Sequence, residues 1–180
     1  MTSCGAKGNE LNLWLHNSWI SSCCKSTPSR LEGVDDIFSN PNIMAEKAAL
    51  DAGIQHPSCE YCWQRERKGL SSLRHTKTTA KKIEITFDNT CNFTCLYCSP
   101  YASSKWHSLI SNTDSSFLRR NSTGSNGSIY SEEAMERIID QINSTPVESI
   151  TIMGGEPLLS KNFDRFLDKY QLNQCTFQYQ

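Results

Sequence analysis

The spacing of apolar side chains divides the chain into an irregular first part and a second part in which strands and helices alternate. Residues 82–87 alternate apolar and polar positions and are rich in β-branched and aromatic side chains, which predicts a strand. Further elements are expected, in chain order, as a helix over 99–111, a helix from Ser131 to Pro146, a strand over 149–153, a helix over 161–170 and a strand from Cys175 to Tyr179. Strands alternating with helices predict an α/β fold with right-handed crossovers and a parallel sheet.

The helix expected after Ser131 has the clearest periodicity in the chain. Met135, Ile138, Ile139 and Ile142 recur at the i, i+3, i+4, i+7 spacing of one helical face. Residues 112–128, which precede it, carry almost no apolar side chain and are expected to form a flexible loop.

The first part of the chain gives weaker signals. A strand or turn is expected within residues 11–20, and a helix from Pro41 to Ala52, because Asn40 and Pro41 form a start signal and Gly53 suits its end. The loose apolar face of that helix is expected to consist of Ile43, Met44, Ala48 and Leu50. A short polar helix over 64–68 and a Ser/Thr/Lys-rich linker over 70–81 follow, so we place a domain boundary between residues 80 and 81. Residues 1–80 are then a small, mainly helical segment that bears cysteines.

Charge and hydropathy exclude several classes of function. The chain has 18 basic and 19 acidic residues, so neither nucleic acid nor a membrane surface is an expected partner. No apolar run approaches the roughly 20 residues that a spanning helix needs. The first residues lack the apolar core of a secretory signal, so a cytoplasmic location is expected.

Cysteine is the one residue type whose count is unusual. There are nine cysteines, and seven lie in three groups: the adjacent pair Cys23-Cys24, the pair Cys59 and Cys62, and the triplet Cys91, Cys95 and Cys98. In a reducing compartment, clustered cysteines are more often metal ligands than disulfides.

The triplet follows directly on the strand over 82–87, where α/β folds concentrate their ligand sites. Cysteine thiolates are the ligands of iron–sulfur clusters, and three thiolates leave one iron of a four-iron cubane open to another ligand. Zinc is the competing metal, but structural zinc sites usually have four protein ligands in paired modules. The triplet therefore favours an iron–sulfur cluster with one open iron.

Two motifs together resemble the radical S-adenosylmethionine (SAM) superfamily. The first is CxxxCxxC, with Asn92 after its first cysteine and Tyr97 before its last. The second is Gly154-Gly155-Glu156-Pro157, directly after the strand over 149–153, which is similar to the GGEP motif of the family. The resemblance covers about residues 82–180.

The resemblance implies a mechanism and a set of cofactors. Cys91, Cys95 and Cys98 would hold a [4Fe–4S] cluster, and the amino and carboxylate groups of SAM would chelate the fourth iron. Reductive cleavage of SAM would give a 5′-deoxyadenosyl radical that abstracts hydrogen from a substrate, which family analogy suggests is a peptide or protein. An electron donor such as flavodoxin or ferredoxin would be a partner.

The same resemblance gives roles to the residues around the cluster. Gly154 and Gly155 would let the backbone approach SAM closely, Glu156 would accept a hydrogen bond from its ammonium, and Tyr97 would contact the adenine. Pro157 completes the motif.

The N-terminal cysteines are similar to the leader of twitch-type radical SAM proteins, which carry CC and then CxxCW before the cluster loop. Cys23, Cys24, Cys59 and Cys62 are therefore candidates for a second metal site, either an auxiliary iron–sulfur cluster or zinc; the alternative is a set of reduced thiols. His16 and His56 are expected to be solvated rather than ligands, and Cys4 and Cys175 have no partner in sequence.

The family's catalytic domain is a partial (β/α)6 TIM-like barrel, of which this chain supplies three strands. Three interpretations remain open: a truncated or split gene product, a chain that pairs with a second polypeptide completing the barrel, or the first part of a longer protein. The alternative function is a non-catalytic module that binds zinc or an iron–sulfur cluster.

Overall fold

The computed structural model describes residues 4–31, 36–74, 81–113, 131–170 and 176–179, the last range without its side chains. The strands are β1 (Glu10–Trp14), β2 (Trp19–Ser21), β3 (Ser29–Arg30), β4 (Lys82–Thr86), β5 (Ser149–Met153) and β6 (Thr176–Tyr179). The α-helices are α1 (Pro41–Asp51), α2 (Glu60–Arg67), α3 (Ser104–Ser111), α5 (Glu132–Ser144) and α6 (Lys161–Lys169). Short 3-10 turns lie at Leu15–Asn17, Ile37–Ser39, Pro57–Cys59 and Pro157–Leu159.

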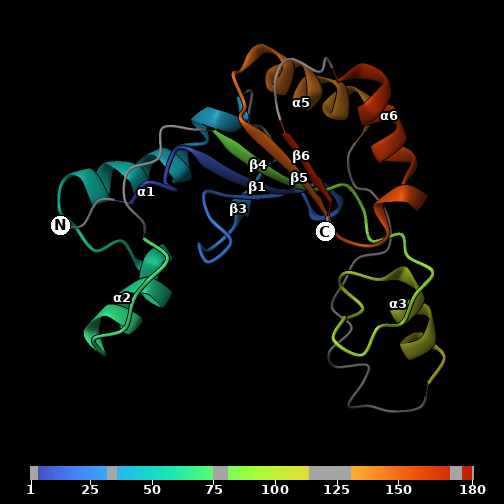
Figure 1. Cartoon of the computed structure of the whole chain (residues 1–180), viewed down its shortest axis with the longest axis horizontal. Helices are drawn as coiled ribbons and strands as arrows, with labels where there is room; N and C mark the ends of the chain where they lie inside the picture. Colours follow the sequence, from blue (N-terminus) through green and yellow to red (C-terminus); the bar gives the residue numbers. More distant parts are fainter. Residues whose placement is uncertain (1–3, 32–35, 75–80, 114–130, 171–175, 180) are drawn as a thin grey trace.

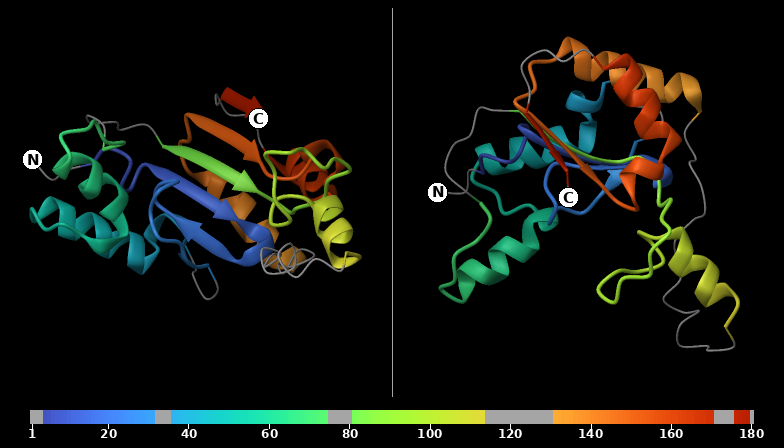
Figure 2. Two further views of the ribbon diagram at one scale, coloured as in Figure 1. Left: turned by 90° about the horizontal axis from the view of Figure 1, so that it is seen from below. Right: turned by 45° about the vertical axis from the view of Figure 1, so that its right-hand side comes forward.

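All six strands belong to one sheet, in the order β3-β2-β1-β4-β5-β6 (Figures 1 and 2). Strands β1, β4, β5 and β6 are parallel neighbours, whereas β2 and β3 add an antiparallel edge next to β1. The parallel β4-β5-β6 arrangement confirms the α/β prediction for the second part. The prediction of a mainly helical segment ahead of it needs correction, because residues 10–30 add three strands to the same sheet.

The register of the three central strands gives the sheet two different faces. Leu11, Ile83 and Ile150 are cross-strand neighbours, and so are Leu13, Ile85 and Ile152, and all six are buried. Helices α5 and α6 lie on this apolar face (Figure 1), where their side chains join one core cluster with the strands and with Ile43 of α1. The alternating residues, among them Asn12, Glu84 and Thr151, form the opposite, polar face.

Helix α1 begins and ends close to where the sequence predicts. Asn40 accepts hydrogen bonds from the backbone of Asn42 and Ile43, and Gly53 adopts a left-handed φ of 81° beyond the end. Its buried face differs from the prediction. Met44 is 46% exposed, whereas Glu46 is 4% exposed. The reason is an ion pair with Lys7, which lets a carboxylate occupy the buried position.

Helix α3 begins five residues later than the predicted start at residue 99. Ser103 is its N-cap and accepts from the Trp106 N–H, while residues 99–103 belong to the loop that precedes it. The segment 112–128 lies mostly outside the described residues, and Cys175 lies wholly outside them. Among the helices that the structure describes, none has the length and apolar character required to span a bilayer.

Candidate cluster and cofactor site

The cysteine loop leaves the carboxyl end of β4 through a tightly bonded corner. Asp88, which is 9% exposed, accepts hydrogen bonds from the Thr90 N–H (2.9 Å) and from the hydroxyl of Ser160. Ser160 in turn caps α6, since its hydroxyl accepts from the Phe163 N–H at 3.2 Å. The start of the cysteine loop is therefore anchored to the helix that follows β5.

Helix α3 holds the backbone of the cysteine loop. The Ser104 hydroxyl lies 3.0 Å from the Cys91 nitrogen and 3.2 Å from the Cys91 oxygen, and the Ser103 hydroxyl donates to the Phe93 carbonyl at 2.8 Å. The Trp106 indole donates to the Cys95 carbonyl at 2.9 Å. This side chain therefore fixes the middle of the loop.

The three thiols of the loop are half-buried, and the side chains between them face solvent. Leu96 is 97% exposed and Tyr97 is 94% exposed. The Phe93 N–H approaches the Cys91 sulfur at 3.4 Å, which is the kind of contact that stabilises a thiolate. Among the described residues, no three His, Cys, Asp or Glu side chains converge on one metal position. A cubane binds each thiolate through a different iron, so convergence on one point is not what it requires.

The Gly154-Gly155 turn packs directly against this loop. Both glycines have left-handed φ angles, 82° and 52°. A Cβ on Gly154 would lie 2.2 Å from the Thr86 methyl group, and one on Gly155 would lie 2.4 Å from the Thr90 carbonyl. The turn is also bonded to the loop region, because Gly155 N donates to Ala102 O at 3.0 Å and Glu156 N donates to Thr90 O at 2.7 Å. The two motifs, about 60 residues apart in sequence, therefore form one structural unit at the carboxyl ends of β4 and β5.

The remaining predicted cofactor residues have different surroundings. Pro157 is buried as the first residue of a 3-10 turn, and the partly buried Glu156 caps that turn by accepting from the Leu158 N–H at 3.4 Å. The hydrogen bond between the Tyr97 hydroxyl and Cys95 raises the pKa of Tyr97, and the ring is exposed outside the core.

His16 lies at the same end of the sheet and is not solvated as the sequence suggested. It is 1% exposed, its Nε2 lies 2.8 Å from the Asn17 side-chain amide, and its ring contacts Tyr101 edge-on at 5.2 Å. Burial lowers the pKa of His16, and the nearby Asp88 carboxylate partly opposes that shift.

A second group of cysteines lies at the other end of the molecule, around α2 (Figure 1). Cys59 and Cys62 are one helical turn apart and both buried, so they face the same way. One small pocket is lined by Cys4, Lys7, Cys23, Lys25, Ser26, Ser58, Cys59, Cys62, Leu73 and Arg74. Cys4, which had no partner in sequence, thus joins three of the four predicted ligands. Cys24 is exposed and lines a different cavity, on the polar face of the sheet.

A buried charge pair supports this pocket. The ammonium of Lys7 contacts the Glu46 carboxylate and the hydroxyls of Ser22 (2.6 Å) and Ser26 (2.8 Å). Burial raises the pKa of Cys59, and it raises the pKa of Cys23 to about 11. With its walls as they stand, the pocket has a free volume of about 10 Å³. Because that space holds roughly one water molecule, a cubane would enter only if the walls moved apart.

Comparison with known proteins assigns the family. The model of the radical SAM superfamily matches residues 83–178, which include both motifs of the cluster end. The chain belongs to the radical SAM superfamily. A curated relative, the radical SAM cyclopropyl synthase TigE of Paramaledivibacter caminithermalis, is 31% identical over 111 residues, or 60% of this chain. The chain spans 22% of the length of that relative. No solved structure matches it significantly.

Members of this superfamily use a [4Fe–4S] cluster and S-adenosylmethionine, and they generally need an electron donor. The residues at the cluster end fit these groups. Three thiols at a solvent-facing loop would supply the donor set, and the Gly154–Gly155 backbone would offer the cofactor a surface free of Cβ atoms.

Sequence reasoning missed the residues that support the cysteine loop and those that build the N-terminal cysteine pocket. Ser103 and Ser104 could have been found as helix-start residues, because serine is a strong N-cap. Cys4 and the Lys7–Glu46 pair carry no local signal, since their partners are 19 to 58 residues away in sequence.

Proposed function

We propose that this chain is the cofactor-binding part of a radical SAM enzyme whose substrate is a peptide or protein. Residues 81–180 are the N-terminal portion of its core domain, a partial (β/α)6 barrel. Residues 1–80 form a cysteine-bearing segment whose strands β1, β2 and β3 extend the same sheet. The observation that carries the proposal is the contact between the cysteine loop and the Gly154–Gly155 turn, because it brings ligands for a cluster and a surface for its cofactor together.

In this proposal Cys91, Cys95 and Cys98 hold the cluster, which, when bound, supplies one electron for cleavage of S-adenosylmethionine at its open iron and so generates the hydrogen-abstracting radical. Ser104 and Trp106 fix the loop backbone around the thiolates. Gly154 and Gly155 would line the cofactor, Glu156 would accept a hydrogen bond from its ammonium, and Tyr97 would contact its adenine. A flavodoxin or ferredoxin is the proposed electron donor, and the cytoplasm the proposed location.

A second proposed metal centre uses Cys4, Cys23, Cys59 and Cys62, the four thiols that line the N-terminal pocket. Four thiolates suit either zinc or an iron–sulfur cluster. Since no three of the described His, Cys, Asp or Glu side chains converge on one metal position, even a single ion requires these thiols to move closer together. A cluster also requires displacement of side chains such as Leu73, because the free volume is small. Cys24 is outside this set because it faces another cavity.

Anaerobic reconstitution tests the cluster site. We expect about four irons and four sulfides per chain at the loop, and an EPR spectrum of the reduced protein that changes when S-adenosylmethionine is added. Cys95→Ala should remove this signal. Stoichiometric zinc without acid-labile sulfide, together with a silent EPR spectrum, would refute the proposal and support a non-catalytic zinc module instead.

The N-terminal centre is tested in a chain that carries Cys91→Ser, Cys95→Ser and Cys98→Ser, so that any bound metal belongs to the other pocket. Metal and sulfide analysis then distinguishes zinc from iron–sulfur. Cys23→Ala should remove this metal, and Cys24→Ala is the matched control that should retain it. Equal loss in both variants, or no metal in the parent, would contradict the assignment.

A further inference from the structure

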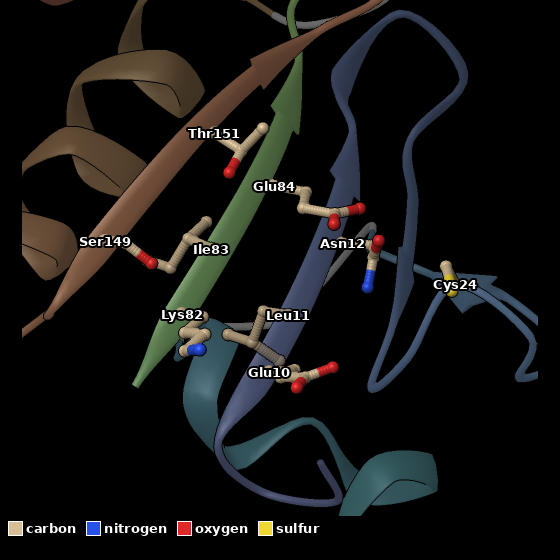
Figure 3. A pocket seen from close by; sticks show the side chains of 9 residues that line it. All are labelled: Glu10, Leu11, Asn12, Cys24, Lys82, Ile83, Glu84, Ser149 and Thr151. Carbon is tan, nitrogen blue, oxygen red and sulfur yellow. The ribbon is translucent and has the colours of Figure 1, made fainter. Parts of the chain in front are cut away.

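A cavity of about 180 Å³ lies on the polar face of the sheet, over β1, β4 and β5. It is lined chiefly by alternate residues of these strands, with Cys24 at one side (Figure 3). The cavity lies at the amino-terminal half of the strands, whereas the cysteine loop and the glycine turn leave from their carboxyl ends. Since a strand rises about 3.3 Å per residue, Glu84 is about 7 Å along β4 from Thr86, the last residue of the strand before the cysteine loop.

Two carboxylates face this cavity. Glu84 is central, with Asn12 and Thr151 as its cross-strand neighbours. Glu10 lies on β1, two residues before Asn12. Burial raises the pKa of Glu84, and the neighbouring charge of Glu10 raises it further, so the two groups interact. Within the part of the chain that the structure describes, neither carboxylate forms a hydrogen bond or an ion pair. The one cation on the lining is Lys82, an exposed residue at the rim and the cross-strand neighbour of Glu10.

Asn12 provides an independent sign of a missing ligand. Its side chain is aimed into the cavity beside Glu84 (Figure 3), and the residue is only 3% exposed. Its Oδ1 atom has no hydrogen-bond partner among the described residues. A buried acceptor left without a donor is destabilising by about 1–3 kcal/mol, so native proteins normally satisfy it. We therefore expect Asn12 Oδ1 to accept a hydrogen bond from a group outside the described residues.

The chemistry of the lining selects the ligand. Glu10, Glu84 and Asn12 offer acceptor oxygens with a surplus of negative charge, and the Thr151 hydroxyl also accepts. A primary ammonium has three N–H donors and a positive charge, which suits a cavity with several acceptors and two carboxylates. We propose that this cavity binds a primary ammonium group of the substrate, supplied by a lysine side chain or by an amino terminus. That the ammonium belongs to a substrate rests on the proposed function, whereas ammonium binding itself does not require a cluster.

The position of the cavity fits that role. An ammonium held at Glu84 would anchor a substrate along the polar face, leaving the rest of it to extend toward the carboxyl ends of β4 and β5. There the glycine turn and the cysteine loop meet. The site would therefore act on specificity by positioning, at a distance from the reacting atoms.

Titration of the iron-free chain with small probes tests the site, because it does not depend on cluster assembly. The probes are Nα-acetyl-lysine N-methylamide, its norleucine analogue without the charge, and alaninamide, which carries only an α-ammonium. Binding is followed by the NMR signal of the Asn12 side-chain amide. We expect the lysine probe or alaninamide to bind at least about tenfold more tightly than the norleucine probe, and their difference identifies the source of the ammonium.

Variants make the result specific. Glu84→Gln and Glu10→Gln should each weaken binding of the preferred probe about tenfold, whereas Glu133→Gln, an exposed residue on α5 across the sheet, should not change it. Equal affinity for the charged and uncharged probes would overturn the proposal, as would binding of magnesium chloride in place of either ammonium. Ammonium binding in a chain that assembles no cluster would refute the proposed function and leave this site standing.

Discussion

The two cysteine regions differ in how far their thiols and neighbouring side chains are exposed to solvent. The loop of Cys91 to Cys98 is open: its thiols are half-buried, and its intervening side chains, such as Tyr97, face solvent. The pocket of Cys59 and Cys62 is closed, with both thiols buried. The open loop leaves room for a second ligand beside the thiols, so we propose catalytic chemistry there and a structural role for the pocket.

The interactions that hold the two regions in place also differ. The loop is held by neutral hydrogen bonds from Ser103, Ser104 and Trp106 to its backbone, and these bonds do not use the sulfurs. The pocket stands on the buried pair of Lys7 and Glu46, whose side chains are only 3% and 6% exposed. A buried charge is tolerated only with its partner, so the pocket is expected to be the more sensitive of the two regions to a single substitution.

The largest effect is expected for Glu46→Gln. This change leaves the buried Lys7 ammonium without its counter-charge, and breaking such a pair typically costs about 3–5 kcal/mol. Urea denaturation would measure the loss. The exposed pair of Lys47 and Asp51 provides the control, because Asp51→Asn should cost about 0.5 kcal/mol or less. A similarly small effect of both variants would show that the buried pair is no more important to stability than the exposed one.

Gly155→Ala should give the next largest effect, about 2–3 kcal/mol, together with a lower iron content after reconstitution. The new Cβ would combine a left-handed φ of 52° with a 2.4 Å contact to the Thr90 carbonyl. Gly69→Ala measures the cost of the left-handed backbone alone, since Gly69 has a φ of 70° but nothing lies within 4 Å of an added Cβ. That control should cost about 1 kcal/mol. If the two glycine variants had equal stability, the close packing of the two motifs would not be significant.

A smaller effect is expected for Ser104→Ala, which removes the hydroxyl that contacts both the nitrogen and the carbonyl of Cys91. We expect a loss of about 1 kcal/mol and faster release of iron on exposure to a chelator. Ser111→Ala should change neither quantity, because Ser111 is exposed on the same helix and, among the described residues, its hydroxyl contacts only the His107 ring.

The weakest of these effects is the pH dependence from His16. Burial lowers its folded-state pKa, so below the unfolded value of about 6.5 the unfolded chain binds the proton more readily. Stability should therefore fall as the pH decreases from about 7 toward 5. His16→Gln should flatten this part of the profile in denaturation curves recorded at several pH values; an unchanged slope would assign the dependence to other groups.

Much of this molecule is encoded locally. Asn40 and Ser131 cap the helices that they were expected to start, and the alternation over 82–87 and 149–153 forms paired strands. Capping and alternation depend on neighbours within a few residues, so sequence alone reveals them. The same is true of the CxxxCxxC spacing, because one short loop carries all three thiols.

The tertiary structure decided what depends on distant parts of the chain. It placed residues 10–30 in the sheet, buried Glu46 in place of Met44, and brought Cys4 into the pocket that Cys24 does not enter. It also aligned Asn12 with Glu84 across two strands separated by about 70 residues in sequence. Strand register and long-range ion pairs have no local signature, because their free energy arises only when the chain brings the partners together.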